Sequence, residues 1–302
     1  MINLINKFRK YFNKTIFRTP GVEYFRQNKS IESKKKYINF WLQKAKRNKS
    51  LKKYFFAQTL NNHSEITYRI KNDEYIISKN MFSALSETGL LIIENALPNF
   101  EKSFIIDHFS ELKRNTTYTK NWLKTPQNPN FFTEVNEVMG PISIRNFKYL
   151  NNYSKQLSKE IYGKIVEPTV EFRYLKQSIN SKEKKTRGAT FLHTDRFLPH
   201  FKVYYTPYAI TINDAPLEYV LSSHKINNNF INFYLNAKNF DETDEGFKKF
   251  NLPKKLVCVP ENSLYVAFTN GFHRRVEFNS ENDRSLVFLQ YVERFNKLDY
   301  LI

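Results

Sequence analysis

Apolar residues in the second half of the chain recur in short runs separated by turn residues, a pattern typical of β-strands. After an alternating run at 170–175, such runs occupy residues 201–206, 217–221, 255–259, 263–269, 273–278 and 285–292. Many short strands in succession favour a sandwich or jelly roll. The dipeptide Asn270-Gly271 is typical of a hairpin turn, so we expect residues 273–278 to run back along residues 263–269.

Residues 66–162, which precede these strands, mix helical periodicity with irregular stretches. Apolar spacing predicts helices at 80–87, from Asn99 to about 112, and at 144–162. Alternation at 66–70 and again at 75–77 predicts a short hairpin. Residues 115–141 contain prolines and several asparagines without a pattern, so we expect a long loop, and loops of that length are often binding loops or lids.

The first 60 residues are basic and amphipathic. They contain sixteen Lys and Arg against two Glu, and so account for +14 of the net charge of +19. Helical spacing predicts amphipathic helices at 2–17 and 31–47, the second with its apolar face at Tyr37, Ile38, Trp41, Leu42 and Ala45. This face could pack on the rest of the protein, or the helices could lie on an anionic membrane or glycolipid; nucleic-acid binding is the least favoured interpretation. We predict an N-terminal extension at 1–75 and a main domain at 76–302.

Other features of the sequence indicate the cellular compartment. The single cysteine, Cys258, excludes an intramolecular disulfide and fits a reducing compartment. Its apolar neighbours predict a thiol packed in the core. No apolar run approaches the roughly 18 to 20 residues of a membrane span, and no signal peptide opens the chain. We expect a cytoplasmic protein whose residues 1–50 could contact the inner membrane surface peripherally.

His193 and Asp195 are the strongest candidates for chemistry. Alternate side chains on a strand point to the same side, so this imidazole and this carboxylate converge on one point. His273, 78 residues after Asp195, is the candidate for a third ligand. Two histidines and one carboxylate are typical of non-haem Fe(II) oxygenases. A surface hydrogen bond between the residues of a His-x-Asp tripeptide is the alternative.

Arg284 stands at the start of the apolar run 285–292. Its planar guanidinium could clamp a carboxylate through two parallel hydrogen bonds, or it could be a solvated turn residue. His200 would act as a ligand only if the strand around His193 ended early. The basic stretch 180–188 could meet an anionic substrate or be a solvated run of charges.

These residues, taken in order, carry a resemblance to a known family. His193-x-Asp195, then residues 201–205, residues 215–224, His273 and Arg284 resemble the phytanoyl-CoA dioxygenase-like family of Fe(II)/2-oxoglutarate oxygenases, and residues 85–98 are similar to the opening of that family's domain. The resemblance covers about residues 80 to 295. One departure is Ser222-Ser-His224, where the family commonly has Gly-Ser-His, which leaves the conformation of that turn open.

The resemblance implies both a fold and a reaction. The fold is α+β and mainly β: a double-stranded β-helix, or cupin-like jelly roll, with flanking helices and the basic N-terminal extension. His193, Asp195 and His273 would hold Fe(II), which binds the cosubstrate 2-oxoglutarate and O2, while Arg284 would meet the cosubstrate's C5 carboxylate. The products would be succinate, CO2 and a hydroxylated substrate. An acid at position 195, where related halogenases have a small residue, favours hydroxylation.

Other functional classes stay open. A nucleic-acid demethylase of the AlkB type is disfavoured because position 290, six residues after Arg284, is Gln rather than Arg. A non-catalytic jelly roll that binds an anionic membrane or a partner through its basic helices is the main alternative. For the enzyme, the basic extension and the stretch 180–188 point to a small-molecule, lipid-linked or carbohydrate substrate that is anionic.

Overall fold

The structure, a computed structural model, describes residues 30–57, 65–71, 73–114, 132–139, 141–177, 192–195, 199–236, 251–276 and 282–291. The helix predicted at 2–17 and the basic stretch 180–188 lie outside these ranges.

Seven strands form the larger of two sheets, in the order β1-β2-β8-β5-β10-β4-β3. Neighbouring strands are antiparallel except β1 and β2, which are parallel. Both faces of this sheet are covered, which explains why β8 is buried at every position. The strands are β1 (Thr67–Arg69), β2 (Leu90–Glu94), β3 (Phe132–Met139), β4 (Thr169–Gln177), β5 (Phe201–Thr206), β8 (Ser263–Phe268) and β10 (Asn282–Gln290).

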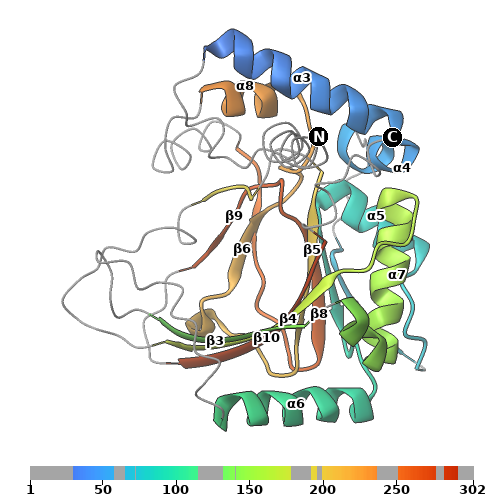
Figure 1. The fold of residues 1–302 in the computed structure, drawn as a ribbon, viewed down its shortest axis with the longest axis vertical. Coiled ribbons are helices and arrows are strands. Elements are labelled where there is room, and N and C mark those ends of the chain that lie inside the picture. Colours follow the sequence, from blue (N-terminus) through green and yellow to red (C-terminus); the bar gives the residue numbers. More distant parts are fainter. Residues whose placement is uncertain are drawn as a thin grey trace, which may run out of the picture.

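Three shorter strands form a second sheet in the order β7-β6-β9, which faces the larger one (Figure 1). They are β6 (Leu217–Val220), β7 (Lys254–Leu256) and β9 (His273–Arg275). A β-bridge between His193 and His273 continues this sheet beyond β9. From β4 onward the chain therefore alternates between the sheets: β4 lies in the large one, His193 in the small one, β5 in the large, β6 and β7 in the small, β8 in the large, β9 in the small and β10 in the large.

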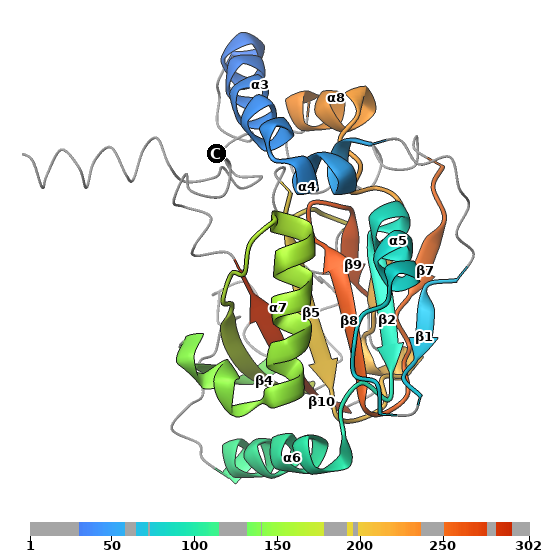
Figure 2. The same cartoon turned by 90° about the vertical axis from the view of Figure 1, so that its right-hand side faces the viewer.

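Helices cover the outer face of the large sheet and its two ends. Helices α5 (Lys79–Thr88) and α7 (Lys148–Tyr162) lie along the outer face (Figures 1 and 2). Helix α6 (Asn99–Arg114) crosses one end, and α3 (Ile31–Arg47), α4 (Lys49–Leu51), the π-helix η1 (Lys52–Phe56) and α8 (Asn228–Asn236) lie at the other. No helix in the described part of the chain has the length and apolarity needed to cross a bilayer.

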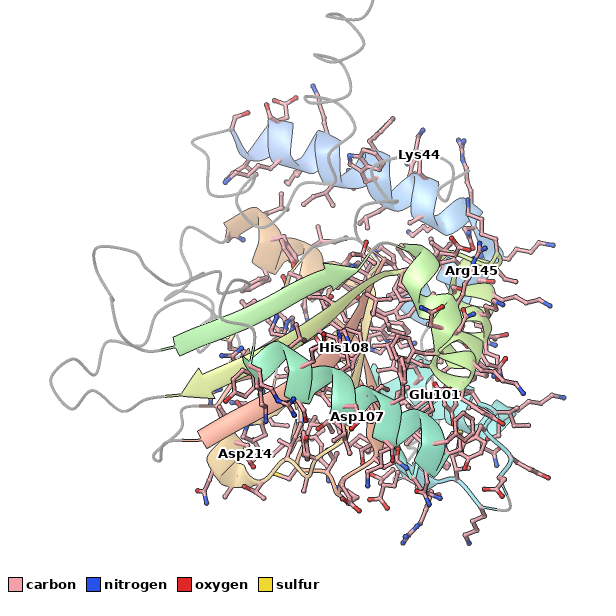
Figure 3. All side chains as sticks on the ribbon, turned by 60° about the horizontal axis from the view of Figure 1, so that its bottom comes forward. Lys44, Glu101, Asp107, His108, Arg145 and Asp214 are labelled. Carbon is pink, nitrogen blue, oxygen red and sulfur yellow. The ribbon has the colours of Figure 1, made fainter. Side chains whose placement is uncertain are left out.

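Helix α7 illustrates how the sequence sets these elements. Its apolar residues recur every three or four positions and are fully buried against the large sheet: Leu150, Tyr153, Leu157 and Ile161. The first-turn amides of Tyr149 and Leu150 donate to the carboxylate of Glu101 on α6, at 3.0 and 2.9 Å; Glu101 is labelled in Figure 3. The helix ends at Gly163, whose φ of +75° suits a left-handed cap.

The predicted helix at 31–47 is α3, and its apolar face is buried in the protein. Ile38, Trp41, Leu42 and Ala45 are at most 4% exposed. They belong to the same apolar cluster as the residues under α7. This is the packing interpretation of the basic helix, and it leaves the lysines of α3 on the outside. The boundary at residue 75 stays a prediction.

Several sequence predictions are wrong in the region of the strands. Residues 66–77 do not form a hairpin, because β1 pairs with β2. Residues 263–268 and 273–275 are not hairpin neighbours either: a turn at Asn270-Gly271 exists, but it carries the chain from β8 in one sheet to β9 in the other. The loop predicted at 115–141 includes a strand, β3, which pairs with β4.

Cys258 is exposed rather than packed in the core. Val257 and Val259 on either side of it are buried. Side chains alternate along an extended segment, so burying the two valines turns the thiol outward.

Candidate metal centre

Three potential metal ligands meet between the two sheets. One ligand atom each from His193, Asp195 and His273 lies within 4.8 Å of the others. The Asp195 Oδ1 is 3.8 Å from His193 Nε2 and 3.6 Å from His273 Nε2. The three side chains therefore converge, as the sequence predicts. That they act as metal ligands rather than as a polar cluster stays a prediction.

The backbone fixes this convergence. The amides and carbonyls of His193 and His273 exchange two hydrogen bonds of 2.9 Å, which places the two histidines directly opposite each other on antiparallel chain segments. Their rings lie 4.6 Å apart between centroids. The Asp195 amide donates to the carbonyl of Thr269 at 2.8 Å, so the turn after β8 also holds the acid.

The tautomer of His273 follows from its neighbour. Its Nδ1 lies 2.9 Å from the Gly271 carbonyl oxygen, which can only accept a hydrogen bond, so Nδ1 carries the proton and donates. Nε2 is then the ring nitrogen that faces Asp195, at 3.6 Å from Oδ1. A histidine that donates one ring N–H to a carbonyl while the other nitrogen faces the site is the usual arrangement around a protein-bound metal.

Lys202 on β5 also reaches the cluster. Its Nζ lies 2.8 Å from the Asp195 Oδ2, and the two side chains are 20% and 24% exposed. Burial raises the pKa of Asp195, but Lys202 and then the two imidazoles lower it by more, so the pKa of this carboxyl lies well below its ordinary value. Asp195 is therefore an anion at neutral pH, as a ligand must be.

A cavity of about 160 Å³ opens beside the three ligands and is lined from both sheets. Part of its wall is apolar or aromatic, including Tyr204, Tyr265, Leu286 and Phe288. The rings of Tyr204 and Tyr265 stack at 4.7 Å. The rest of the wall is strongly cationic and comprises Arg173, Lys202, Arg274, Arg275 and Arg284.

Arg284 is buried in this wall, and the solvated-turn alternative for it is wrong. It is 8% exposed, and its guanidinium donates to the carbonyls of Ala215 at 2.6 Å and Asp214 at 3.4 Å. Asp214, labelled in Figure 3, lies beside the first residues of β10. The buried Nε of Arg284 has no hydrogen-bond partner among the described residues. A buried guanidinium held by two carbonyls, with a donor left over, is suited to an anionic ligand.

The other two candidate histidines do not join the cluster. His200 is 1% exposed, and its Nδ1 is 2.5 Å from the Thr269 hydroxyl. His224 is completely buried, with its Nε2 3.1 Å from the carbonyl oxygen of Ser86. Both are structural residues next to the site.

Ser222 stands where the family that the sequence resembles commonly has a glycine, and the structure shows which conformation this turn adopts. Its φ is +63°, in the left-handed region that glycine occupies readily and serine rarely. The Ser222 amide donates to the Thr88 carbonyl at 2.6 Å, and its hydroxyl donates to the Glu87 carbonyl at 2.9 Å. These two bonds to the end of α5 hold the turn in the conformation that a glycine would adopt freely.

Sequence reasoning missed Lys202, Arg173 and Arg275. A signal existed for two of them. Lys202 is the one charged residue in the apolar run 201–205, and Arg275 is two positions after His273 and so on the same side of β9. Arg173 pairs with Glu171, two positions away on the same strand, at 2.8 Å. Its guanidinium also lies 4.3 Å from the centre of the Phe288 ring on β10, a contact between strands that no local pattern indicates.

Comparison with known proteins finds solved structures that are similar to the chain, whereas no family model and no curated protein sequence matches it. One similar structure is EctD from S. alaskensis with 2-oxoglutarate and 5-hydroxyectoine, at 14% identity and a TM-score of 0.49 over 78% of this chain and 85% of that one. A second is the non-heme alpha ketoglutarate dependent carbocyclase SnoK from nogalamycin biosynthesis, at 14% identity and a TM-score of 0.47 over 70% and 83%. A third is HygX from Streptomyces hygroscopicus with nickel and 2-oxoglutarate bound, at 15% identity and a TM-score of 0.40 over 70% and 85%. The functional assignment of this chain rests on the side chains of its cavity.

Proposed function

We propose that this protein is a non-haem Fe(II)- and 2-oxoglutarate-dependent oxygenase, and specifically a hydroxylase that releases succinate and CO2. The observation that carries the proposal is the combination of two features in one cavity. His193, Asp195 and His273 offer three ligand atoms within 4.8 Å, and buried Arg284 lines the same cavity. A metal site alone would suit many reactions; the buried arginine adds a place for the far carboxylate of a 2-oxo diacid.

The donor set fits ferrous iron. Two imidazoles and one carboxylate on one side of a metal, with the other positions open, are typical of non-haem Fe(II) oxygenases. When bound, the iron would supply the oxidative chemistry with O2 and 2-oxoglutarate. The two-sheet arrangement, with the chain alternating between sheets and the ligands at their shared interior, supports a double-stranded β-helix of the phytanoyl-CoA dioxygenase-like kind.

The chain's own residues would bind, orient and shield the reactants. Arg284, fixed by the carbonyls of Ala215 and Asp214, would hold the C5 carboxylate without having to reorganise. Leu286 and Phe288, next on the same face of β10, would exclude water from the path between that carboxylate and the metal. The protein would thus supply position and a dry wall.

We further propose an anionic substrate, either a small molecule or a lipid-linked compound such as a carbohydrate. Five cationic side chains line the cavity against one acidic side chain, Asp195, among the described residues. Arg173 and Arg274 are paired with Glu171 and Glu218, and Lys202 with Asp195, so these three charges are balanced and the support for an anion comes mainly from Arg284. A cationic wall attracts anions and disfavours neutral ligands. Because the apolar face of α3 is buried in the protein, the proposed peripheral contact with an anionic membrane from the cytoplasmic side would depend on the outward lysines of this helix alone. A nucleic-acid substrate gains no support.

Succinate formation tests the proposal. Protein incubated aerobically with Fe(II), ascorbate and 2-oxoglutarate is expected to release succinate slowly, faster with a true substrate, and to stop when a chelator is added. Asp195→Ala is the matched inactive variant. A wild-type rate equal to that of Asp195→Ala under all conditions would favour the non-catalytic alternative, a scaffold that binds a membrane or partner through its basic helices.

A further inference from the structure

Lys202 is placed where a lysine is costly. It is the second residue of β5, between Phe201 and Val203, which are completely buried. Its ammonium is directed into the space between the sheets and lies 2.8 Å from the Asp195 Oδ2. An ammonium group partly removed from water is tolerated when an ion pair offsets the lost hydration, and Lys202 makes such a pair with one particular oxygen of Asp195.

We propose that Lys202 is a positioning residue that restricts Asp195 to a single bond with the metal. This inference rests on the proposed function. It concerns how many positions on the iron stay open, which the identity of the three ligands does not decide.

The two oxygens of Asp195 have different surroundings. Oδ1 faces the Nε2 atoms of His193 and His273 at 3.8 and 3.6 Å, whereas Oδ2 is the oxygen that Lys202 contacts. The bond from the Asp195 amide to the Thr269 carbonyl limits movement of the main chain. The carboxylate could therefore present both oxygens to a metal only by giving up the ammonium.

The number of carboxylate bonds decides whether the proposed reaction is possible. An octahedral metal held by two imidazoles and one oxygen keeps three open positions. A 2-oxo acid that chelates through its keto and carboxylate oxygens fills two of them, and the third is left for O2. If Asp195 bound through both oxygens, the chelate would fill the site and no position for O2 would remain.

This role predicts that replacing Lys202 raises the affinity for the metal, whereas the loss of a supporting residue usually lowers it. In the metal-free protein, Lys202 stabilises the Asp195 anion, and a divalent cation must then bind beside an ammonium. Replacing Lys202 by a neutral residue removes that repulsion and frees the second oxygen. Metal should therefore bind more tightly, while access for a further small ligand should fall. A lysine that only supported the fold would give weaker metal binding when removed.

The experiment compares Lys202→Met, Lys202→Arg and a matched control, Lys102→Met. Lys102 pairs with Glu261 at 3.1 Å, and the two side chains are 17% and 67% exposed. The control thus removes a lysine as little exposed as Lys202 from an ion pair that lacks the candidate metal ligands. Mn(II) affinity is measured from the electron paramagnetic resonance signal of the free ion. Nitric oxide, which binds ferrous iron in place of O2, is then titrated into the anaerobic complex with Fe(II) and 2-oxoglutarate.

For Lys202→Met we expect Mn(II) to bind at least threefold more tightly and nitric oxide at least tenfold more weakly than in the wild type. Lys202→Arg should restore nitric oxide binding to within threefold, and Lys102→Met should change neither value by more than twofold. Weaker Mn(II) binding in Lys202→Met, or nitric oxide binding equal to that of the wild type, would overturn the inference. If Lys202→Met does not fold, Lys202→Gln replaces it.

Failure of the proposed function would look different. It would show as a wild type that binds no Fe(II) and 2-oxoglutarate together. The Mn(II) comparison requires no cosubstrate, so it tests the effect of Lys202 on Asp195 in either case.

Discussion

The two faces of the large sheet are formed by the same strands but carry different kinds of side chain. On the outer face, under α5, α6 and α7, the side chains are apolar and almost completely buried, as at Phe172, Val203 and Val287. On the inner face, the alternate positions of the same strands carry Arg173, Lys202 and Arg284. The inner face has a buried apolar cluster of its own, which includes Tyr265 and Leu286. The difference teaches that the two faces are alike in apolar packing, and that the inner face in addition accepts buried charges that a ligand can use.

Phe172→Ala should give the largest effect and should act on stability alone. Phe172 is completely buried on β4 and contacts the rings of Phe109 and Phe147 at 5.3 and 5.6 Å. Removing a buried phenylalanine costs about 3–5 kcal/mol of unfolding free energy. Urea denaturation measures this loss. A loss of unfolding free energy of the same size in Arg284→Ala would contradict the proposed difference between the two faces.

Arg284→Ala should show the reverse behaviour, with a large effect on ligand binding. Truncating one partner of a buried charge pair costs roughly 2–3 kcal/mol or more, which is a weakening of 2-oxoglutarate binding by about thirtyfold to 150-fold. Iron affinity should stay within threefold, because Arg284 is not a ligand. Isothermal titration under anaerobic conditions gives both constants. Arg145→Ala is the control, since Arg145 is exposed and pairs with Glu167 on the surface. Arg145 is labelled in Figure 3.

The buried His224 should make stability depend on pH. Burial and then nearby Lys225 hold the pKa of His224 well below its ordinary value. The unfolded chain takes up a proton below about pH 6.5, whereas the folded protein does so only at much lower pH. Stability should therefore be fully present above pH 7 and fall as the pH drops below 6.5, by at most about 1.4 kcal/mol per pH unit for this group. Thermal melts at pH 7.5 and 5.5 measure the slope, and His224→Gln should flatten it.

The smallest effect is expected at the surface. Lys53 pairs with Glu160 at 2.7 Å, but their side chains are 60% and 37% exposed. Exposed ion pairs contribute about 0–1 kcal/mol, so Lys53→Met should shift the unfolding free energy by less than about 1 kcal/mol. A larger shift would mean that charges outside the cavity carry stability that the comparison assigns to apolar packing.

Much of the candidate site could be predicted from the sequence, because its candidate ligands are side chains whose types and spacing along a strand are visible in the sequence itself. His193 and Asp195 share a face by alternation, and α3 and α7 follow from helical periodicity. The assignment of β9 to the second sheet could not be predicted, because a turn such as Asn270-Gly271 does not record which neighbour the next strand will choose. The same limit concealed β3, whose pairing with β4 is not local.

Residues that act through contacts across the fold were the hardest to predict. Lys202 reaches Asp195 from another strand, and the conformation of Ser222 depends on bonds to Glu87 and Thr88, more than 130 positions earlier in the chain. The exposure of Cys258 shows a related difficulty, since an apolar run indicates burial of a segment but not which of its alternate positions face outward. Such features depend on tertiary packing rather than on local pattern.

The central claim is that His193, Asp195, His273 and Arg284 together bind iron and 2-oxoglutarate. Its most direct test is the visible spectrum of the wild-type protein mixed anaerobically with Fe(II) and 2-oxoglutarate. We predict the charge-transfer band of the iron–2-oxo-acid chelate, present with both additions and absent when either is omitted or when Asp195 is replaced by Ala. A folded wild-type protein whose spectrum is unchanged by the two additions together would contradict the assignment.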